Sequence, residues 1–309
     1  MTKLSQKDVL RADQFSKKEI GLIMETARGY EKALDEGKLL DVMRGLVLST
    51  LFYEPSTRTR LSFETAMLRL GGRVISVAEA KSSSAVKGES LHDTMKTVEG
   101  YADVIVLRHP QIGSAQEAAA ATDKPVLNAG DGAGQHPTQS LLDLYTILKE
   151  QGKVDGLTVA LAGDLKNGRT AHSLADLLGN YEVEFVFAAP DALRMPSEIV
   201  ERLKARGISV QETAGLTEAV ALADVLYMTR IQRERFDDPA EYDRLKDAFV
   251  LTRPMLEPAK PGLTVMHPLP RVNEIATDVD SYEGAAYFRQ AANGIPIRMA
   301  LLALVCGRA

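Results

Sequence analysis

The sequence predicts an α/β protein with two doubly wound parallel-sheet domains and an active site in the cleft between them. Short apolar runs alternate with amphipathic helical patterns along the chain, which is typical of βα units around a parallel sheet. The length of 309 residues corresponds to about two domains. Polar segments follow several of the apolar runs, at the strand ends where sheets of this class bind ligands.

In the first half, apolar runs predict strands at residues 46–52, 73–77, 104–107 and from 126 onward. The turn-forming segment Glu54-Pro55-Ser56 precedes the first predicted helix. Pro137 begins the third predicted helix, at a position where the missing N–H of proline costs little. The apolar faces of the helices are Phe63, Ala66, Met67 and Leu70; then Leu91, Thr94, Met95 and Val98; then Leu141, Leu144, Tyr145 and Leu148.

The second half repeats the pattern, with strands predicted near residues 158–162, 183–188, 208–211, 225–228 and 263–266. The last helix, roughly 295–305, is apolar on most sides, so we expect it to be buried. We expect one domain at residues 1–137, with a terminal helix at 293–309 packing back on it, and a second domain at 138–292.

Composition excludes several classes of protein. A net charge of −5 disfavours a nucleic-acid partner. No apolar run approaches the ~18 residues of a membrane span, and the first residues contain no apolar signal core. The single cysteine, Cys306, excludes an internal disulfide framework and a cysteine-rich metal site. We therefore expect a cytoplasmic protein without a membrane or nucleic-acid partner.

Residues 56–60, Ser-Thr-Arg-Thr-Arg, lie between a predicted strand and a predicted helix. A capped surface helix is the plainer interpretation, but arginines are unfavourable at the positive end of a helix dipole unless an anion binds there. Backbone N–H groups, hydroxyls and a guanidinium together suit a phosphate. The segment predicts a phosphate site in which Arg58 binds the anion, while Arg60 could instead pair with an acid.

A second group follows the next strands of the first half. Arg108 alone would be interpreted as a surface ion pair, but a glycine-rich segment from Asn128 leads to His136 and Gln139. Side chains three apart in a helix project side by side. A neutral imidazole at a helix N-terminus, where its pKa is lowered, can donate to a carbonyl oxygen.

The second half contributes Arg169, then Arg230 with Gln232, and the rigid segment 267–271, each after a predicted strand. Forked guanidinium groups suit carboxylates, so this set predicts a dicarboxylate ligand. Dinucleotide, P-loop and nucleophile-elbow motifs are missing, and the histidines lack metal-ligand spacing. We expect direct transfer between two bound anions, with no metal, no cofactor and no covalent step.

These motifs resemble the aspartate/ornithine carbamoyltransferase family, in the family's order and over most of the chain. The matching segments are FYEPSTRTRLSFE (52–64), KGE (87–89), RHPQ (108–111), HPTQ (136–139), GRTAHSL (168–174), MTRIQ (228–232) and HPLPR (267–271). The resemblance implies transfer of the carbamoyl group of carbamoyl phosphate to an amine, through a tetrahedral intermediate. It implies that 1–137 is a carbamoyl-phosphate-binding domain and that 138–292 is an aspartate-binding domain.

The resemblance favours the aspartate branch of the family. The ornithine branch has SMG and HCLP motifs where this chain has MTRIQ and HPLPR, and an arginine at position 230 repels ornithine's ammonium. The implied products are N-carbamoyl-L-aspartate and phosphate, in the committed step of de novo pyrimidine (UMP) biosynthesis. A carbamoyltransferase for another amine stays open; a non-catalytic scaffold is disfavoured because Arg58, Arg108, His136 and Arg169 are all present.

The resemblance also implies the residue roles. Catalysis would depend on Arg58, Thr59, Arg108 and His136. Carbamoyl phosphate would be held by Ser56, Thr57, Arg58, Thr59, Arg108, His136, Gln139, Pro268 and Leu269. Aspartate would be held by Lys87, Arg169, Arg230 and Gln232. Glu54, Arg169 and Arg235 match positions that link the two domains when the cleft closes.

Ser83 and Lys87 match residues that this family inserts into a neighbouring subunit's site, although a solvated loop is the simpler interpretation of the segment itself. With the resemblance, we expect a homotrimer whose active sites are shared between subunits. The resemblance leaves open whether a regulatory chain or another enzyme of the pyrimidine pathway binds as a further partner.

Overall fold

The computed structural model describes residues 4–79, 84–233, 236 and 238–309. The chain divides into two compact units, which we call unit 1 (Met1–Leu141 with Asn293–Ala309) and unit 2 (Leu142–Ala292). The division falls inside one helix and the return falls inside another, so each unit contains residues of both. The functional domain boundary at 137/138 stays a prediction.

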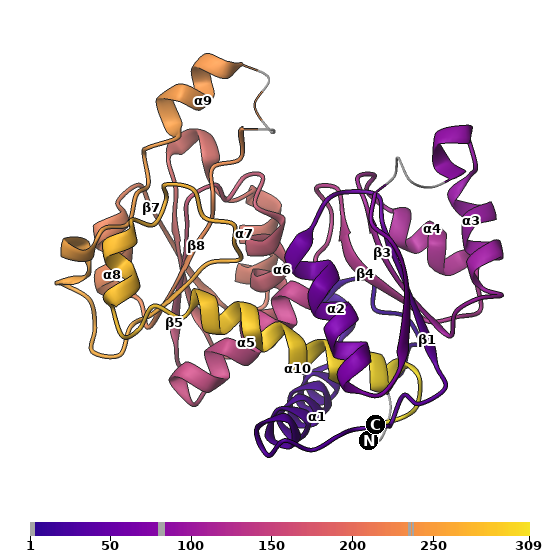
Figure 1. Ribbon diagram of the computed structural model, residues 1–309. Helices are drawn as coiled ribbons and strands as arrows, with labels where there is room; N and C mark the ends of the chain where they lie inside the picture. Colours follow the sequence, from indigo (N-terminus) through magenta and orange to yellow (C-terminus); the bar gives the residue numbers. More distant parts are fainter. Residues whose placement is uncertain (1–3, 80–83, 234–235, 237) are drawn as a thin grey trace. The chain divides into compact units, whose positions relative to one another are not determined.

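Unit 1 contains a four-stranded parallel sheet in the order β2-β1-β3-β4. Helices α3 and α4 lie on one side of this sheet and α2 on the other (Figure 1). The elements are η1 Ala12–Gln14, α1 Lys17–Asp35, β1 Val47–Phe52, α2 Thr57–Arg69, β2 Arg73–Val77, η3 Ser84–Lys87, α3 Leu91–Val98, β3 Val104–His109, α4 Ser114–Ala120 and β4 Val126–Asp131, followed by α5 Pro137–Gln151.

Unit 2 contains a five-stranded parallel sheet in the order β7-β6-β5-β8-β9. Its elements are β5 Thr158–Ala162, α6 Arg169–Leu178, β6 Glu184–Ala188, η4 Asp191–Leu193, α7 Ser197–Ala205, β7 Ser209–Thr213, α8 Leu216–Leu222, β8 Val225–Met228, α9 Pro239–Leu245, η6 Arg253–Leu256, β9 Thr264–Met266 and η7 Thr277–Ser281, followed by α10 Tyr287–Val305.

The predicted fold class, two parallel-sheet α/β domains, is confirmed. The predicted strands agree with the structure to within a few residues. The inner strands β1, β3 and β5 are buried along nearly their whole length, so they are nearly continuous apolar runs in the sequence. The last helix begins at Tyr287, earlier than predicted. The apolar pattern did not reveal its first turns because they carry polar residues such as Gln290 and Asn293. Its second half, from Met299 to Leu304, is buried as expected.

Helix α1 is an element that the sequence reasoning missed. Ser16 caps it, and Glu19 completes the capping box by accepting hydrogen bonds from the amide and hydroxyl of Ser16. The same carboxylate accepts from the amide and hydroxyl of Ser5. Burial by itself would raise the pKa of Glu19, but these hydrogen bonds outweigh it and lower the pKa to about 2.

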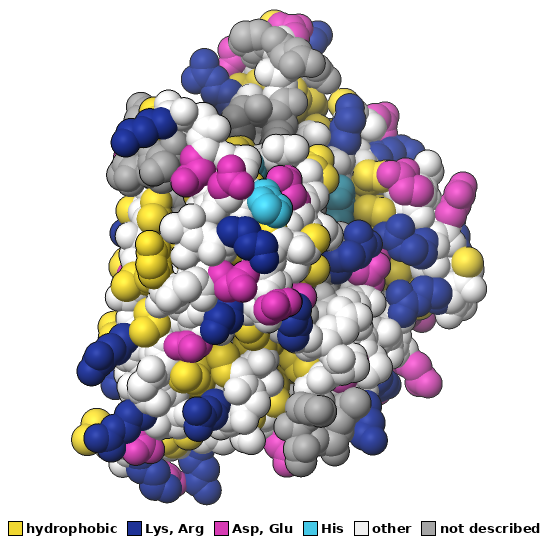
Figure 2. All heavy atoms as spheres, turned by 90° about the vertical axis from the view of Figure 1, so that its right-hand side faces the viewer, with side chains coloured by type: hydrophobic (Ala, Val, Ile, Leu, Met, Phe, Trp, Pro, Cys, Tyr) yellow, Lys and Arg dark blue, Asp and Glu magenta, His cyan; other side chains and the backbone are white. Residues whose placement is uncertain are grey.

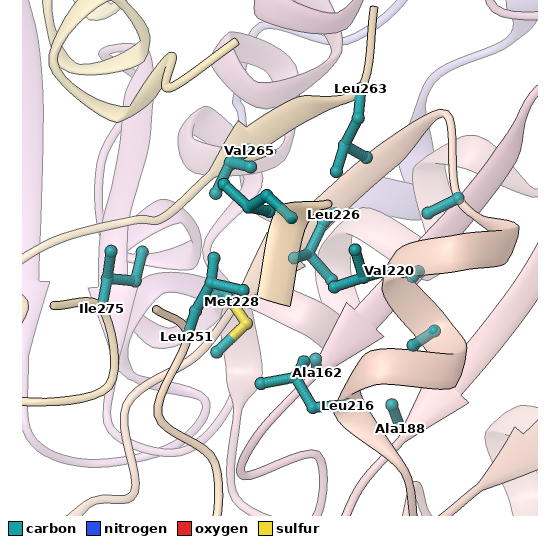
Figure 3. Packing of buried hydrophobic residues seen from close by; sticks show 14 of the residues in the cluster. Ala162, Ala188, Leu216, Val220, Leu226, Met228, Leu251, Leu263, Val265 and Ile275 are labelled. Atoms are coloured by element: carbon teal, nitrogen blue, oxygen red, sulfur yellow. The ribbon is translucent and has the colours of Figure 1, made fainter. Parts of the chain in front are cut away.

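The core of unit 2 lies between strands β5, β8 and β9 and helix α8. Small residues on β5 and β6, Ala162 and Ala188, leave room for Leu216 and Val220 of α8 to approach the sheet. Figure 3 shows Leu226 of β8 among Val220, Leu263 and Val265, with their side chains directed toward one another. This packing holds the strand ends of unit 2 in place.

The surface mixes charges of both signs. On the face in Figure 2, lysine and arginine side chains are interspersed with aspartate and glutamate, and no single sign covers it. Within the described residues, no helix combines the length and the apolar character needed to cross a membrane.

We expect Leu226→Ala to lower the free energy of unfolding by about 2–5 kcal/mol, because Leu226 is fully buried and its removal leaves a cavity. Leu222→Ala on α8 is the matched control, since Leu222 is 37% exposed and its truncation costs about 1 kcal/mol or less. Chemical unfolding of both variants measures the difference. Equal losses for the two would contradict this assignment of the core.

Candidate active site

In unit 1 the predicted site residues follow three adjacent strands. Phe52 at the end of β1 pairs with Arg108 on β3, and His109 on β3 pairs with Asp131 at the end of β4. Parallel strands end at the same edge of their sheet, so the segments that follow β1, β3 and β4 emerge next to one another. The sheet order reverses between β1 and β3, which is where ligands bind in this class of fold.

The first segment forms the N-terminus of α2. Ser56 has extended backbone angles and occupies the N-cap position, as predicted, but its hydroxyl accepts no capping hydrogen bond. The first turn of α2 places Thr57 and Arg58 in exposed positions and buries Thr59 to 7% exposure. Partial burial lowers the pKa of Arg58, although an arginine stays charged at neutral pH.

Arg60 faces a different partner. Its Nη1 lies 4.0 Å from Oε1 of Glu64, one turn along α2, and 3.5 Å from the hydroxyl of Ser76. The Ser76 hydroxyl donates to the same Glu64 oxygen. The alternative left open by the sequence, that Arg60 pairs with an acid, is the one found.

Arg108 is held on β3 by groups from both neighbouring strands. Its Nη2 lies 2.7 Å from Oε2 of Glu54, which follows β1, and its Nη1 donates to the carbonyl of Ala129 on β4 at 3.1 Å. The arginine is 9% exposed, so this ion pair is largely removed from water. The resemblance matches Glu54 to a position that links the two domains. In the structure, Glu54 forms an ion pair with Arg108 of the same unit.

The segment between β4 and α5 is tightly organised. Asp131 accepts hydrogen bonds from the amides of Gly113 and Gln135. Gly132 has φ +56°, and a Cβ there would lie 2.2 Å from the carbonyl oxygen of Pro110, so only glycine fits. This arrangement brings His136, 5% exposed, to the start of α5, where its carbonyl accepts from the amide of Gln139.

Unit 2 repeats this construction with β5, β8 and β9, which are adjacent in its sheet. Arg169 is the first residue of α6, after the loop that follows β5. Arg230 and Gln232 follow β8, and the side-chain amide of Gln232 donates to the backbone carbonyl of Asn167 at 3.5 Å. Pro268 and Leu269 follow β9.

The loops after β5 and β8 touch through their backbones. Gly163 has φ +110°, and a Cβ there would lie 2.3 Å from the carbonyl oxygen of Thr229. The Thr229 hydroxyl donates to the carbonyl of Ala162 at 3.0 Å. Asp164, fully buried, accepts from the amide of Asn167, and burial raises the pKa of its carboxyl. The position of Arg230 is therefore linked to the loop that precedes Arg169.

The predicted site residues thus fall into two groups, one in each unit, which we call the two half-sites. Unit 1 brings together Ser56, Thr57, Arg58, Thr59, Arg108, His136 and Gln139. Unit 2 brings together Arg169, Arg230, Gln232, Pro268 and Leu269. Lys87 ends η3 and is exposed. Ser83 and Arg235 lie outside the described residues.

Two family models match the chain. Residues 7–149 match the carbamoyl-phosphate-binding domain of aspartate/ornithine carbamoyltransferase, and residues 155–305 match the aspartate/ornithine-binding domain. The chain belongs to the aspartate/ornithine carbamoyltransferase family.

Known carbamoyltransferases of this family are similar over nearly their whole length. The aspartate carbamoyltransferase catalytic subunit of Thermococcus kodakarensis is 55% identical over 301 residues, 97% of each chain. The crystallised catalytic subunit of the M. jannaschii enzyme is 50% identical with a TM-score of 0.91, over 97% of this chain and 98% of that one. The aspartate transcarbamoylase of Trypanosoma cruzi, crystallised with carbamoyl phosphate and aspartate, is 42% identical with a TM-score of 0.92, over 96% of each chain.

The carbamoyltransferase fold supports its half-sites with buried polar residues that the sequence reasoning missed. Asp143 on α5 accepts from the hydroxyl of Tyr227 at 2.9 Å and from the side-chain amide of Gln290 at 2.6 Å. Burial and the nearby Asp143 carboxylate raise the pKa of Tyr227, so the phenol keeps its proton. A signal existed: Asp143 interrupts the otherwise apolar run Leu141-Leu142 and Leu144-Tyr145.

Metal binding finds no support in the part of the chain that the structure describes. There, no three histidine, cysteine, aspartate or glutamate side chains lie close enough to hold an ion. The charged groups of the two half-sites are arginines, whose N–H groups bind anions directly.

We expect Gly163→Ala to lower the free energy of unfolding by about 2–5 kcal/mol, because the methyl group adds a clash with the Thr229 carbonyl to the strain of a positive φ. Gly152→Ala is the matched control: its φ is +72°, but nothing lies within 4 Å of the added Cβ. The control should lose only about 1–2 kcal/mol. Thermal and chemical unfolding of the pair would refute the contact if both variants lost the same amount.

Proposed function

We propose that this chain transfers the carbamoyl group of carbamoyl phosphate to the amine of L-aspartate, giving N-carbamoyl-L-aspartate and phosphate. Within the family, the observation that carries the choice of aspartate is Arg230 with Gln232 directly after β8, beside the loop that leads to Arg169. Two guanidinium groups in one half-site suit a dicarboxylate and repel the ammonium of ornithine.

The first half-site has the chemistry of a phosphate site. The N-terminus of α2 supplies backbone N–H groups and the positive end of a helix dipole. Ser56, Thr57 and Thr59 add hydroxyls, and Arg58 adds a charge whose burial is only partial. In our proposal these four residues bind the phosphate of carbamoyl phosphate, and Arg58 stabilises the phosphate as it leaves.

The carbamoyl carbonyl is assigned to the residues at the ends of β1, β3 and β4. Thr59, Arg108 and His136 would donate to the oxygen that becomes negative in the tetrahedral intermediate. Arg108 is fixed by Glu54 and Ala129, so its donors are oriented before the substrate binds. Gln139 and the backbone carbonyls of Pro268 and Leu269 would hold the carbamoyl NH₂ group.

In unit 2, Arg169, Arg230 and Gln232 would bind the aspartate carboxylates and orient its deprotonated amine for attack. Lys87 would complete the aspartate site. Our proposal requires the two half-sites to act on the two substrates together, in the cleft that the sequence predicts. The T. cruzi enzyme, crystallised with both carbamoyl phosphate and aspartate, supports this pairing of ligands.

The transfer is direct, with neither a covalent enzyme intermediate nor a cofactor. Attack by the amine on the carbamoyl carbon gives a tetrahedral intermediate that expels phosphate, and the phosphate can take the amine proton. Burial raises the pKa of Cys306, the single cysteine, to about 11, which makes its thiol a poor nucleophile. This reaction commits carbamoyl phosphate to pyrimidine synthesis, and a single cysteine fits a reducing, cytoplasmic setting.

We further propose a homotrimer in which Ser83 and Lys87 complete the site of a neighbouring subunit. Three features of unit 1 support a subunit interface. Strand β2 is an edge strand with Ile75 41% exposed. Helix α2 presents Leu61 and Leu68, 48% and 60% exposed. Lys87, which follows β2 in the chain, is also exposed. Relatives named catalytic subunits support assembly with further partners, among them a regulatory chain or another pyrimidine-pathway enzyme.

We expect wild-type protein to carbamoylate aspartate and to leave ornithine unmodified in parallel assays with carbamoyl phosphate. Arg58→Ala and His136→Ala should each lower kcat by about 10²–10³, because each removes a donor to charge that develops in the reaction. Arg60→Ala is the matched control, since Arg60 pairs with Glu64 on the same helix, and it should stay within about fivefold of wild type.

Thermal unfolding of these variants should stay close to that of wild type. N-(phosphonacetyl)-L-aspartate, which the T. cruzi enzyme binds, should block turnover by occupying both half-sites. Preference for ornithine would overturn the choice of nucleophile, and near-normal turnover of Arg58→Ala or His136→Ala would overturn the role assignment.

The trimer with shared sites is tested by mixing inactive variants. Lys87→Ala and Arg58→Ala, dissociated and reassembled together, should recover part of the wild-type activity, because hybrid trimers contain sites without either change. Each variant reassembled with itself is the control. A monomeric mass by light scattering, or no recovery on mixing, would refute shared sites.

A further inference from the structure

The turn after β9 contains an unusual backbone conformation. Leu269 has φ +55° and is the one non-glycine residue with a positive φ in the described part of the chain. The left-handed region is unfavourable for a residue with a side chain, and it persists where surrounding groups hold it. Leu269 is also a residue whose carbonyl, in the proposed function, accepts from the carbamoyl NH₂ group.

His267 holds this residue. The amide of Leu269 donates to Nδ1 of His267 at 2.8 Å, and Nε2 of the same ring lies 2.7 Å from Oε1 of Glu274. An amide N–H can only donate, so Nδ1 must be unprotonated and the ring proton must lie on Nε2, facing Glu274. The side chains of His267 and Glu274 are 1% and 3% exposed. The structure therefore fixes both the tautomer and the orientation of the ring.

The charges of the pair agree with this geometry. Burial lowers the pKa of His267, so the ring is neutral despite the neighbouring carboxylate. Burial by itself would raise the pKa of Glu274, but hydrogen bonds from His267 and the Val272 amide lower it below its usual range. Oε2 of Glu274 accepts from the amides of Val272 and Asn273, at 3.0 and 3.1 Å. Two backbone amides therefore hold the Glu274 carboxylate in place, where it accepts from the proton-bearing Nε2 of His267.

A second chain of hydrogen bonds anchors the backbone of His267. Its amide donates to Oε1 of Gln290 at 2.8 Å, so the Gln290 amide group must point toward Asp143, to which it donates at 2.6 Å. Asp143 also accepts from Tyr227 of β8. The donor and acceptor of each hydrogen bond in this buried series are therefore fixed. Through His267, the series extends to the amide of Leu269.

Unit 1 contains a related turn that lacks the strained residue. After β3, the amide of Gln111 donates to Nδ1 of His109 at 3.1 Å, in the same His-Pro-X arrangement. Gln111 is exposed and has no positive φ. The hydrogen bond alone therefore does not require the left-handed conformation. The positive φ distinguishes the turn at Leu269 from the turn at Gln111.

We propose that His267 is a positioning residue that recognises the carbamoyl amide through Leu269. By accepting the Leu269 amide, His267 holds that residue in the conformation that directs its carbonyl toward the NH₂ group of the substrate. The inference rests on the proposed function and deepens it, because it names the group that distinguishes a carbamoyl from an acetyl substituent. An acetyl group has the same shape but no N–H to donate.

Two stable phosphonates test this recognition without turnover. Phosphonoacetamide has a terminal NH₂, and acetonylphosphonate has a methyl group in the same place. Their dissociation constants for the full-length protein, measured by calorimetry, give an amide-over-methyl preference for each variant. We expect wild type to prefer the amide.

The substitutions at His267 are chosen to separate the two ring nitrogens. In His267→Asn the side-chain oxygen takes the place of Nδ1 and can still accept from Leu269, but the contact with Glu274 is lost. In His267→Gln the side-chain amide can still reach Glu274, but Cγ is a methylene that carries no acceptor in the place of Nδ1. We expect His267→Gln to lower the amide preference at least fivefold while its affinity for acetonylphosphonate stays within about twofold. His267→Asn should keep most of the preference.

Other outcomes have defined meanings. Equal weakening of both phosphonates in His267→Gln would assign His267 a purely structural role and overturn the inference, as would an unchanged preference. If His267→Gln does not fold, His267→Asn decides alone, because loss of the preference there contradicts an acceptor role. A wild-type protein that binds neither phosphonate and transfers no carbamoyl group would instead overturn the proposed function.

Discussion

Parallel pairing of three neighbouring strands is the constraint on which each half-site depends. In unit 1 the register of β1, β3 and β4 places residues 56–59, Arg108 and His136 after adjacent strand ends. In unit 2 the adjacency of β5, β8 and β9 does the same for Arg169, Arg230 and Leu269. These residues are far apart in sequence, and a change of strand order would separate them without altering any single motif.

Concentrating arginines at one sheet edge carries an electrostatic cost that nearby carboxylates offset. Glu54 neutralises Arg108 in a nearly buried position, and Glu64 faces Arg60 from the next turn of α2. Arg58 keeps its charge at the N-terminus of the same helix, where the dipole disfavours a cation and favours an anion. In the proposed phosphate site, a bound anion would therefore relieve a repulsion that the folded chain maintains.

Buried polar groups give the half-site of unit 2 its precision. Asp143, Tyr227, Gln290, His267 and Glu274 form a connected set in which the hydrogen-bond direction of each member is fixed by its neighbour. Such groups are costly to bury unless every partner is present, so they specify a single arrangement. The backbone contact between Gly163 and Thr229 adds a steric constraint between the loops that precede Arg169 and Arg230.

Sequence patterns alone predict the two α/β domains, the strands of both sheets and the segments that carry the arginines, because burial periodicity and helix-terminus electrostatics are local properties of the chain. It also left two choices for Arg60, between an anion and an acid. Tertiary structure decided that choice in favour of Glu64, placed Glu54 on Arg108, and assembled the hydrogen bonds from Asp143 to Leu269. Those outcomes depend on which residues from distant segments meet in the folded core, and no spacing along the chain records that.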